Sequence, residues 1–361
     1  MQKILQGAQG IDWVLAEMGC RRYMLVCDSS FPFLPIKKLF DTEVIFNQIS
    51  PNPLYEDVCR GVEMFNANNC EALVAVGGGS TIDVAKCIKL FCRMNPETNY
   101  LLQAFSDSGI PLVAIPSTAG TGSESTRYAV IYFEGKKQSI THESIIPDYA
   151  VLEPALLKTL PLYQKKCTML DALCQGVESL WSVNSTDESM VYSRMSVRMI
   201  MDHWYGYIEN DSEEAAFHIM QASNFAGRAI NITQTTAPHA MSYKLTSIYG
   251  IPHGHAVALC LPGVWQYMMD HPDRCADPRG SVHLKHVLKE LDCLMQCNLD
   301  DKGLVLFRTI LCSLQLPKPQ VKNRDAELAT LVSSVNPVRL KNNPVPLEED
   351  TIRNIYNNIL P

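Results

Sequence analysis

The sequence lacks the features that mark several classes of protein. It has no run of about 18 apolar residues, so no membrane-spanning helix is expected. No signal peptide, internal repeat, low-complexity linker or basic block can be recognised, and a net charge of -7 argues against nucleic acid and anionic membranes as partners. The 13 cysteines are scattered without a CxxC pair or a regular framework. We therefore expect reduced thiols, several of them in the core, and a cytoplasmic protein.

The composition and length predict two domains. A chain of 361 residues exceeds the size at which one core usually stops growing, and 47% apolar residues suffice for sizeable cores. The first part alternates strand and helix patterns, which predicts an α/β domain with a parallel sheet over residues 1–155. An all-α domain is expected over 156–361, with the ligand site in the cleft between the two. The expected helices of the second domain are 166–182, 187–206, 211–231, 235–249, 254–270, 280–295, 300–315 and 348–359.

A glycine-rich turn is the first candidate binding site. The apolar stretch ALVAVGGGS (72–80) predicts a buried strand that ends in three glycines, and the pattern of residues 81–94 predicts a helix. A strand, a glycine turn and a helix N-terminus together favour an anion such as the pyrophosphate of a nucleotide. The turn matches neither the dinucleotide fingerprint nor the P-loop motif, so an ordinary tight turn fits it equally well. The segment 111–125 repeats the arrangement of a strand followed by small residues.

Four residues form a candidate metal site. Asp171 and Gln175 stand four residues apart on a predicted helix, so their oxygen atoms share one face. His239 and His253 could complete the set. Two oxygen and two nitrogen ligands suit Fe(II), Mn(II) or Zn(II) better than Ca²⁺. Spacing alone does not exclude that these are ordinary packed or surface residues.

Four motifs, in this order and spacing, resemble those of the iron-containing, or group III, alcohol dehydrogenase family. The resemblance runs from QGA at residues 6–8 to NNP near the end of the chain. It implies a dehydroquinate synthase-like α/β domain followed by a helical domain, and an NAD(P)H-linked alcohol dehydrogenase or aldehyde reductase. It also implies a homodimer or a larger homo-oligomer. The motifs are GGGSTIDVAK (77–86), PSTAGTGSES (116–125), TLP with DALCQGVES (159–179) and HAMSYKLTSIYGIPHGHAVAL (239–259).

The resemblance assigns the metal ligands but also shows two departures. Asp171, His239 and His253 match ligand positions of the family, whereas Gln175 stands where a histidine is usual. A carbonyl oxygen there favours harder ions such as Mn(II) or Mg(II), a weaker site, or a site that has lost its metal. Tyr243 replaces another histidine that is thought to move protons in relatives. The proton donor is then Tyr243, His255, water or a ribose hydroxyl, and the sequence leaves these alternatives open.

The cofactor-binding residues also follow from the resemblance. Asp28 ends a predicted strand, where an acidic residue favours NAD(H) over NADP(H), although a helix cap would look the same. Asp83 is expected near the nicotinamide or the substrate, or as a simple first-turn carboxylate, and Lys86 as a solvated helix residue. The N-terminus is shorter than is usual in the family, so the first strand, before the Gly-Ala pair, is expected to be absent or irregular. The predicted cofactor-binding residues are Asp28, Asn52, Gly78, Gly79, Ser80, Thr118, Thr121, Ser123, Lys137 and Leu157.

Two cations suggest an anionic substrate. Arg127 and Lys244 flank the predicted site and would suit a phosphate, phosphonate or carboxylate, although each alone could be an exposed surface cation. The chain most resembles the phosphonoacetaldehyde reductase branch of the family. This predicts a small anionic aldehyde as substrate, with phosphonoacetaldehyde reduced to 2-hydroxyethylphosphonate. The alternatives are a dehydroquinate synthase-like lyase that uses NAD transiently and a binding homologue without activity.

Overall fold

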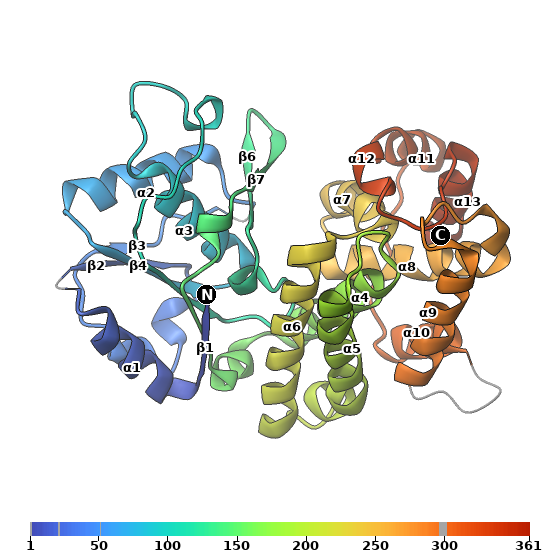
Figure 1. The fold of residues 1–361 in the computed structure, drawn as a ribbon, viewed down its shortest axis with the longest axis horizontal. Helices are drawn as coiled ribbons and strands as arrows, with labels where there is room; N and C mark the ends of the chain where they lie inside the picture. The colour runs from blue at the N-terminus through green and yellow to red at the C-terminus, as the bar shows by residue number, and fades with distance from the viewer. Residues whose placement is uncertain (1, 21, 51, 296–301) are drawn as a thin grey trace. The chain divides into compact units, whose positions relative to one another are not determined.

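A computed structural model describes residues 2–20, 22–50, 52–295 and 302–361 of the chain (Figure 1). The chain forms two compact units, residues 1–160 and 161–361. The division suggested from the sequence, after residue 155, falls within a short 3-10 helix, η6 (Pro154–Thr159), that belongs to the first unit. In the described part of the chain, no helix combines the length and the apolar character needed to cross a bilayer.

The first unit is built on a six-stranded sheet in the order β1-β8-β5-β4-β2-β3. All five neighbouring pairs are parallel, so the carboxyl ends of these strands lie along one edge. A separate antiparallel hairpin, β6-β7, accompanies the sheet. The strands are β1 (Lys3–Gln6), β2 (Tyr23–Cys27), β3 (Ile45–Phe46), β4 (Ala72–Gly77), β5 (Leu112–Pro116), β6 (Tyr128–Phe133), β7 (Lys136–Thr141) and β8 (Tyr149–Leu152).

Both faces of the sheet are covered, because alternate residues of the central strands enter two different cores. Leu73 and Ala75 of β4 pack into one core with α2 and α3, whereas Val74 and Val76 pack into the other with α1. Strands β4 and β5 are therefore buried along their whole length, which explains their continuous apolar sequences. The covering helices are α1 (Gly7–Met18), α2 (Tyr55–Ala67) and α3 (Gly79–Phe91).

Three features of this unit differ from the sequence-based expectation. A first strand does precede Gly7, since β1 pairs in parallel with β8, so the expectation of an absent or irregular strand was wrong. The sequence EVIFNQISP (43–51) is typical of a strand, but the structure confines the strand to the two residues of β3, and residue 51 lies outside the described residues. The hairpin β6-β7 was not predicted: β6 is apolar (YAVIYF), but its partner β7 (KKQSIT) is mostly polar and gives no strand pattern.

The second unit is helical, as the sequence predicted. The predicted helices are present with ends shifted by a few residues, except that residues 300–301 of one of them lie outside the described residues. Two short helices, α11 and α12, were missed. The helices are α4 (Leu162–Trp181), α5 (Asp187–Ile208), α6 (Glu213–Thr233), α7 (Ala237–Tyr249), α8 (His253–Asp270), α9 (Gly280–Leu294), α10 (Gly303–Ser313), α11 (Arg324–Ser333), α12 (Pro337–Leu340) and α13 (Glu349–Ile359).

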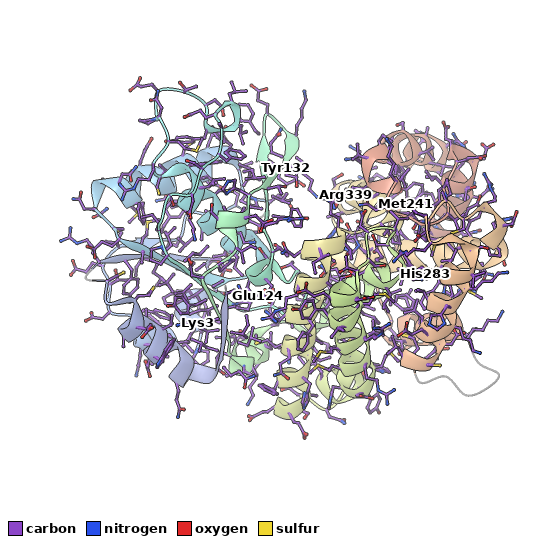
Figure 2. The ribbon with its side chains drawn as sticks, viewed as in Figure 1. Lys3, Glu124, Tyr132, Met241, His283 and Arg339 are labelled. Atoms are coloured by element: carbon purple, nitrogen blue, oxygen red, sulfur yellow. The ribbon has the colours of Figure 1, made fainter. Side chains whose placement is uncertain are left out.

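Helix α4 is the centre of the second unit. It packs against α5, α6 and α8, and all of its residues from Met169 to Trp181 are buried. Helices α7 and α8 follow each other directly and also pack together. The C-terminal helix α13 lies against α8, and the hydroxyl of Tyr356 donates to the carbonyl of Met241 in α7 at 2.7 Å (Met241 is labelled in Figure 2). The charged face of α4 that carries Asp171 is thus enclosed by helices.

Candidate metal and cofactor sites

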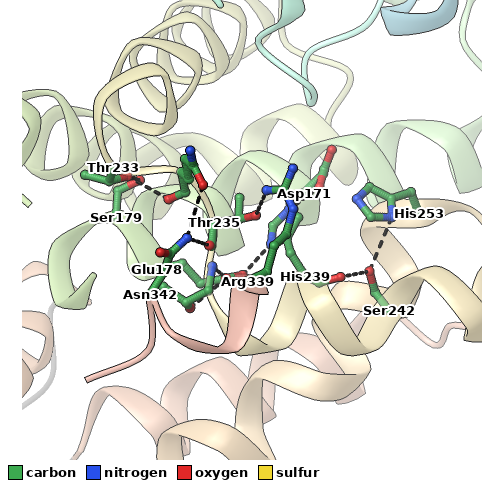
Figure 3. A network of polar contacts seen from close by, with 12 residues as sticks. Asp171, Glu178, Ser179, Thr233, Thr235, His239, Ser242, His253, Arg339 and Asn342 are labelled. Carbon is green, nitrogen blue, oxygen red and sulfur yellow. Dashed lines mark hydrogen bonds and ion pairs between the residues drawn. The ribbon is translucent and has the colours of Figure 1, made fainter. Parts of the chain in front are cut away.

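The second unit brings three of the four predicted metal ligands into one cluster. Asp171 on α4, His239 on α7 and His253 on α8 each offer a ligand atom, and these atoms lie within 4.8 Å of one another (Figure 3). Gln175 is buried one helical turn after Asp171 on the same helix. His239 lies 68 positions after Asp171 in the sequence, and His253 lies 14 positions after His239. The three residues meet because their helices converge.

A glycine permits this convergence. Gly254, the second residue of α8, has no side chain, and a Cβ at that position would lie 2.0 Å from the carbonyl oxygen of Cys167 and 2.7 Å from the Cβ of Asp171. The first turn of α8 therefore rests directly on the backbone of α4. This close approach carries His253 to Asp171, so Gly254 sets the geometry of the cluster without contributing a ligand atom.

The polar atoms at the centre of the cluster fit a divalent ion. Asp171 Oδ1 and His239 Nε2 are buried, lie 3.4 Å apart and have no hydrogen-bond partner among the described residues. Buried polar atoms are nearly always hydrogen-bonded, so two such atoms facing each other indicate a site for a ligand. The donor set of a carboxylate, two imidazoles and the amide group of Gln175 is chemically suited to Fe(II), Mn(II) or Zn(II).

A second layer of residues orients His239. Its Nδ1 donates to Glu178 Oε1 at 2.5 Å, and the other carboxylate oxygen of Glu178 accepts from the backbone N–H and the hydroxyl of Thr236 at 2.7 and 2.8 Å. The indole of Trp181 donates in turn to the Thr236 hydroxyl at 3.0 Å. Glu178 is fully buried, so this carboxylate fixes the ring of His239 with Nε2 directed at Asp171. The spacing could have indicated Glu178, because it follows Asp171 by seven residues and so lies on the same face of α4.

The electrostatics of the cluster favour the charged forms of both partners. Burial raises the pKa of Asp171, but the nearby imidazoles of His239 and His253 bring it below its usual value. Burial lowers the pKa of His239, but the carboxylates of Glu178 and Asp171 raise it to about 9. Both shifts reflect a site that attracts positive charge. A divalent ion bound there would replace any proton on His239 Nε2.

The two candidate proton donors occupy different positions. The ring of Tyr243 stacks on that of His253, with centroids 5.5 Å apart and an interplanar angle of 2°. His255 is buried and faces away from the cluster, with its Nδ1 2.8 Å from the hydroxyl of Tyr163. Two residues along a helix turn the side chain by about 200°, which separates His255 from His253. Burial lowers the pKa of His255 to about 4, so its imidazole is neutral at physiological pH.

In the first unit, several predicted cofactor residues gather at the carboxyl ends of β2, β4 and β5. Gly78 and Gly79 form the first turn of α3, where backbone N–H groups have no helical partner. A Cβ on Gly79 would lie 2.9 Å from the side chain of Thr121, and one on Gly78 would lie 3.4 Å from that of Thr118. Ser80 follows on α3. This arrangement of glycines and hydroxyls at a helix N-terminus is suited to a phosphate group.

Asp28 lies beside this turn. Its Oδ2 is 3.3 Å from the hydroxyl of Thr81, which donates to it, and its Oδ1 accepts from the backbone and hydroxyl of Ser30. The side chain is partly exposed at the end of β2. Asp28 is thus a strand-end carboxylate next to the glycine turn, and its predicted contact with a ribose stays a prediction.

A buried charge network fixes the loop between β5 and β6. Lys86 is fully buried, and its Nζ donates to Ser123 Oγ, Thr126 Oγ1 and the carbonyls of Thr126 and Tyr128 at 2.7–3.1 Å. The expectation that Lys86 is a solvated helix residue was therefore wrong, because α3 turns this face toward the loop and not toward water. Ser123 in turn donates to Asp83 Oδ1 at 2.6 Å.

Asp83 is anchored on both of its oxygens. Oδ1 accepts from Ser123, and Oδ2 accepts from the backbone N–H of Val130 at 2.9 Å. Burial raises the pKa of Asp83, while Lys86, Ser123, Val130 and Lys137 oppose that rise. The structure therefore gives Asp83 and Ser123 a clear role in holding the loop, and their predicted contacts with substrate and cofactor stay predictions.

The remaining predicted residues have varied surroundings. Asn52 is exposed and adopts a left-handed conformation with a φ of 60°, and Lys137 is half-buried on β7. Leu157 in η6 is fully buried. Arg127 forms an ion pair with Glu143 and hydrogen-bonds the hydroxyl of Tyr128, so its guanidinium already has partners within the first unit. Lys244 is half-buried on α7.

Comparison with known proteins assigns the family. The model of the iron-containing alcohol dehydrogenase domain matches residues 2–154, and that of the C-terminal domain of the same family matches residues 166–360. The phosphonoacetaldehyde reductase of Streptomyces viridochromogenes is 34% identical over 250 residues, which cover 65% of this chain and 63% of that protein. The aligned region thus spans less than two thirds of that relative.

Solved structures agree with this assignment. The sulfoacetaldehyde reductase of Bifidobacterium kashiwanohense, solved in complex with NAD+, has a TM-score of 0.86 and 26% identity, and the match covers 99% of this chain and 96% of that one. An iron-containing alcohol dehydrogenase from Thermococcus thioreducens has a TM-score of 0.88 at 23% identity, over 99% and 98% of the chains, and supports the fold alone. The chain belongs to the iron-containing alcohol dehydrogenase family.

Proposed function

We propose that this protein is a metal-dependent, NAD(P)H-linked aldehyde reductase that acts on a small anionic aldehyde, with phosphonoacetaldehyde as the first candidate. The observation that carries the chemistry is the cluster of Asp171, His239 and His253, in which Asp171 Oδ1 and His239 Nε2 are buried and have no hydrogen-bond partner among the described residues. The observation that carries the substrate class comes from two relatives. One is named a phosphonoacetaldehyde reductase and the other a sulfoacetaldehyde reductase, and both names describe an aldehyde with an anionic head group.

The reaction would consume an aldehyde, NADH and a proton and would yield an alcohol and NAD+, and it is reversible. A divalent ion held by Asp171, Gln175, His239 and His253 would polarise the carbonyl group, and the nicotinamide would supply the hydride. Glu178 keeps Nδ1 of His239 protonated, so Nε2 presents its lone pair to the site. Burial of the cluster excludes water, which strengthens every charge interaction within it.

In the first unit, the glycine turn and the N-terminus of α3 would bind the pyrophosphate of the dinucleotide. Asp28 would accept hydrogen bonds from the adenosine ribose and disfavour a 2′-phosphate, which favours NAD(H) over NADP(H). The network of Lys86, Asp83 and Ser123 would hold the neighbouring loop rigid during binding. Tyr243, beside His253, is the residue of the metal cluster that is best placed to hand over a proton.

The test is a reductase assay on protein loaded with Fe(II), Mn(II) or Zn(II). We expect NADH to be oxidised with phosphonoacetaldehyde or sulfoacetaldehyde at a kcat/KM at least tenfold above that with acetaldehyde or butanal. The Asp171→Ala variant should lose this activity, while a Glu209→Gln variant, changed at an exposed residue of the same unit, should keep it.

Two results would contradict the proposal. Equal kcat/KM values for anionic and neutral aldehydes would contradict the proposed preference for anionic substrates but not the proposed reductase activity. The absence of any net change in nicotinamide absorbance with every aldehyde would remove the chemistry as well. In that case, turnover of a phosphorylated sugar acid would indicate a lyase that recycles its NAD, and metal or cofactor binding without turnover would indicate a binding protein.

A further inference from the structure

A guanidinium group that no sequence motif indicated lies next to the metal cluster. Arg339 belongs to the short helix α12, which was not predicted, and its side chain is half-buried (Figures 2 and 3). Its Nη1 donates to the hydroxyl of Thr235 at 3.0 Å. Among the residues that the structure describes, no carboxylate forms an ion pair with Arg339. A guanidinium has five N–H donors, so most of its capacity is left for another acceptor.

A chain of contacts connects Arg339 to the metal ligands. The hydroxyl of Thr235 accepts from Arg339 and also hydrogen-bonds the phenol of Tyr243. The Tyr243 ring stacks on His253. Arg339 is therefore a neighbour of the cluster, within the same unit.

The segment that carries Arg339 is held rigidly against this side of the site. Asn342 donates to the carbonyl of Thr235 at 3.0 Å and to the side chain of Gln234 at 3.3 Å. Its own backbone carbonyl accepts from Val183 at 3.1 Å, and its side chain accepts from Asn184 at 3.0 Å. These bonds fix α12 to the turn before α7. A preorganised arginine loses little entropy when it binds a ligand.

The balance of charge also favours an anion. The carboxylates of Asp171 and Glu178 would together neutralise a divalent ion, and His239 would be a neutral ligand. Arg339 then leaves the loaded cluster with one uncompensated positive charge. An arginine fork is well matched to the oxygen atoms of a phosphonate, sulfonate or carboxylate.

We propose that Arg339 binds the anionic head group of the substrate while the carbonyl end lies at the cluster of Asp171, His239 and His253. This inference rests on the proposed function, because it assigns a residue to the recognition of the anionic aldehyde. It shifts that recognition from Arg127, which is already paired with Glu143, to an arginine of the metal-bearing unit.

The test measures the binding of methylphosphonate, which carries the head group alone, to the full-length, metal-loaded protein by calorimetry. The variants are Arg339→Gln, which can still donate to Thr235 but has no charge, and Arg339→Lys, which keeps the charge. Arg308→Gln, at an exposed arginine on α10, is the matched control. We expect the Kd for methylphosphonate to rise at least tenfold in Arg339→Gln, to rise less in Arg339→Lys and to change less than twofold in Arg308→Gln.

Kinetics with the same variants separates recognition from structure. Arg339→Gln should raise the KM for phosphonoacetaldehyde at least tenfold and the KM for butanal much less, whereas Arg308→Gln should leave both within about twofold. The inference would be overturned if wild type did not bind methylphosphonate, if Arg339→Gln bound it as tightly as wild type, or if both aldehydes were affected equally. If methylphosphonate binding depends on Arg339 but neutral aldehydes react as fast as anionic ones, the anion-binding role of Arg339 is supported and the proposed substrate class is contradicted.

Discussion

The two units differ in whether their buried polar groups have hydrogen-bond partners. In the first unit, Lys86 is fully buried and donates four hydrogen bonds, and Asp83 beside it is bonded on both oxygens. In the second unit, Asp171 Oδ1 and His239 Nε2 are equally buried and face each other without a partner. Among the described residues, every buried side-chain nitrogen or oxygen atom that lacks a hydrogen bond belongs to the second unit.

This difference separates two uses of a buried charge. A charge whose hydrogen bonds are complete holds the fold together, because removing one member leaves the others unpaired. A buried charge with incomplete hydrogen bonds destabilises the protein when no ligand is bound. Such a charge is retained where a bound ligand supplies the missing interactions. The Lys86 network is of the first kind and the Asp171 cluster of the second.

The largest effect is expected from Lys86→Met. This change leaves Asp83 as a buried carboxylate without the nearby cation, and it removes the ammonium that lies within hydrogen-bond distance of four oxygen atoms of the loop and β6. We expect the free energy of unfolding to fall by about 3–5 kcal/mol, measured by urea denaturation. Lys136→Met, at an exposed lysine on β7, should change it by less than about 0.5 kcal/mol. A loss at Lys86 no larger than at Lys136 would show that the network does not hold the unit together.

Gly254→Ala should have the next largest effect. The added Cβ would meet the carbonyl of Cys167, so α8 must move away from α4 and carry His253 with it. We expect a loss of stability of about 1–3 kcal/mol together with weaker metal binding. In the control Gly263→Ala, the Cβ meets the side chain of Ile355 on α13 and not α4, so metal affinity should be unchanged. Normal metal binding in Gly254→Ala would show that the contact between the two helices does not set the site.

A smaller effect is expected from Glu178→Gln. The amide keeps the shape of the carboxylate but accepts a weaker hydrogen bond from His239, which makes the imidazole a poorer ligand. Metal affinity should fall about 10–100-fold, measured by competition with a chelator, while the protein remains folded. Glu209→Gln, at an exposed glutamate of the same unit, should leave metal affinity unchanged. An unchanged affinity in Glu178→Gln would limit Glu178 to a role in folding.

The sequence predicted the parts of this site that depend on local spacing. Asp171 and Gln175 share a helix face by their separation of four residues, and the glycine turn follows directly from the pattern of strand and helix. The two histidines were identified through the family motifs. The structure confirms that both meet Asp171.

The parts that depend on contacts between distant segments could not be predicted. Whether Lys86 is solvated or buried is decided by a loop some 40 residues away, and Arg339 reaches the site from a helix too short to leave a pattern in the sequence. Nothing in the sequence around Gly254 indicates that the backbone of α4 lies directly against it. These residues act through tertiary packing, which periodicity and local motifs do not encode.

The most direct test of the central claim is elemental analysis of protein that has been saturated with Fe(II), Mn(II) or Zn(II) and then desalted. The account predicts one tightly held divalent ion per chain in wild type and a rise in melting temperature on loading, since the ion binds only the folded state. A variant that combines Asp171→Ala with His239→Ala should lose both. The absence of a retained ion in wild type, or equal retention in the variant, would contradict the claim that the unpartnered atoms of Asp171 and His239 form a metal site.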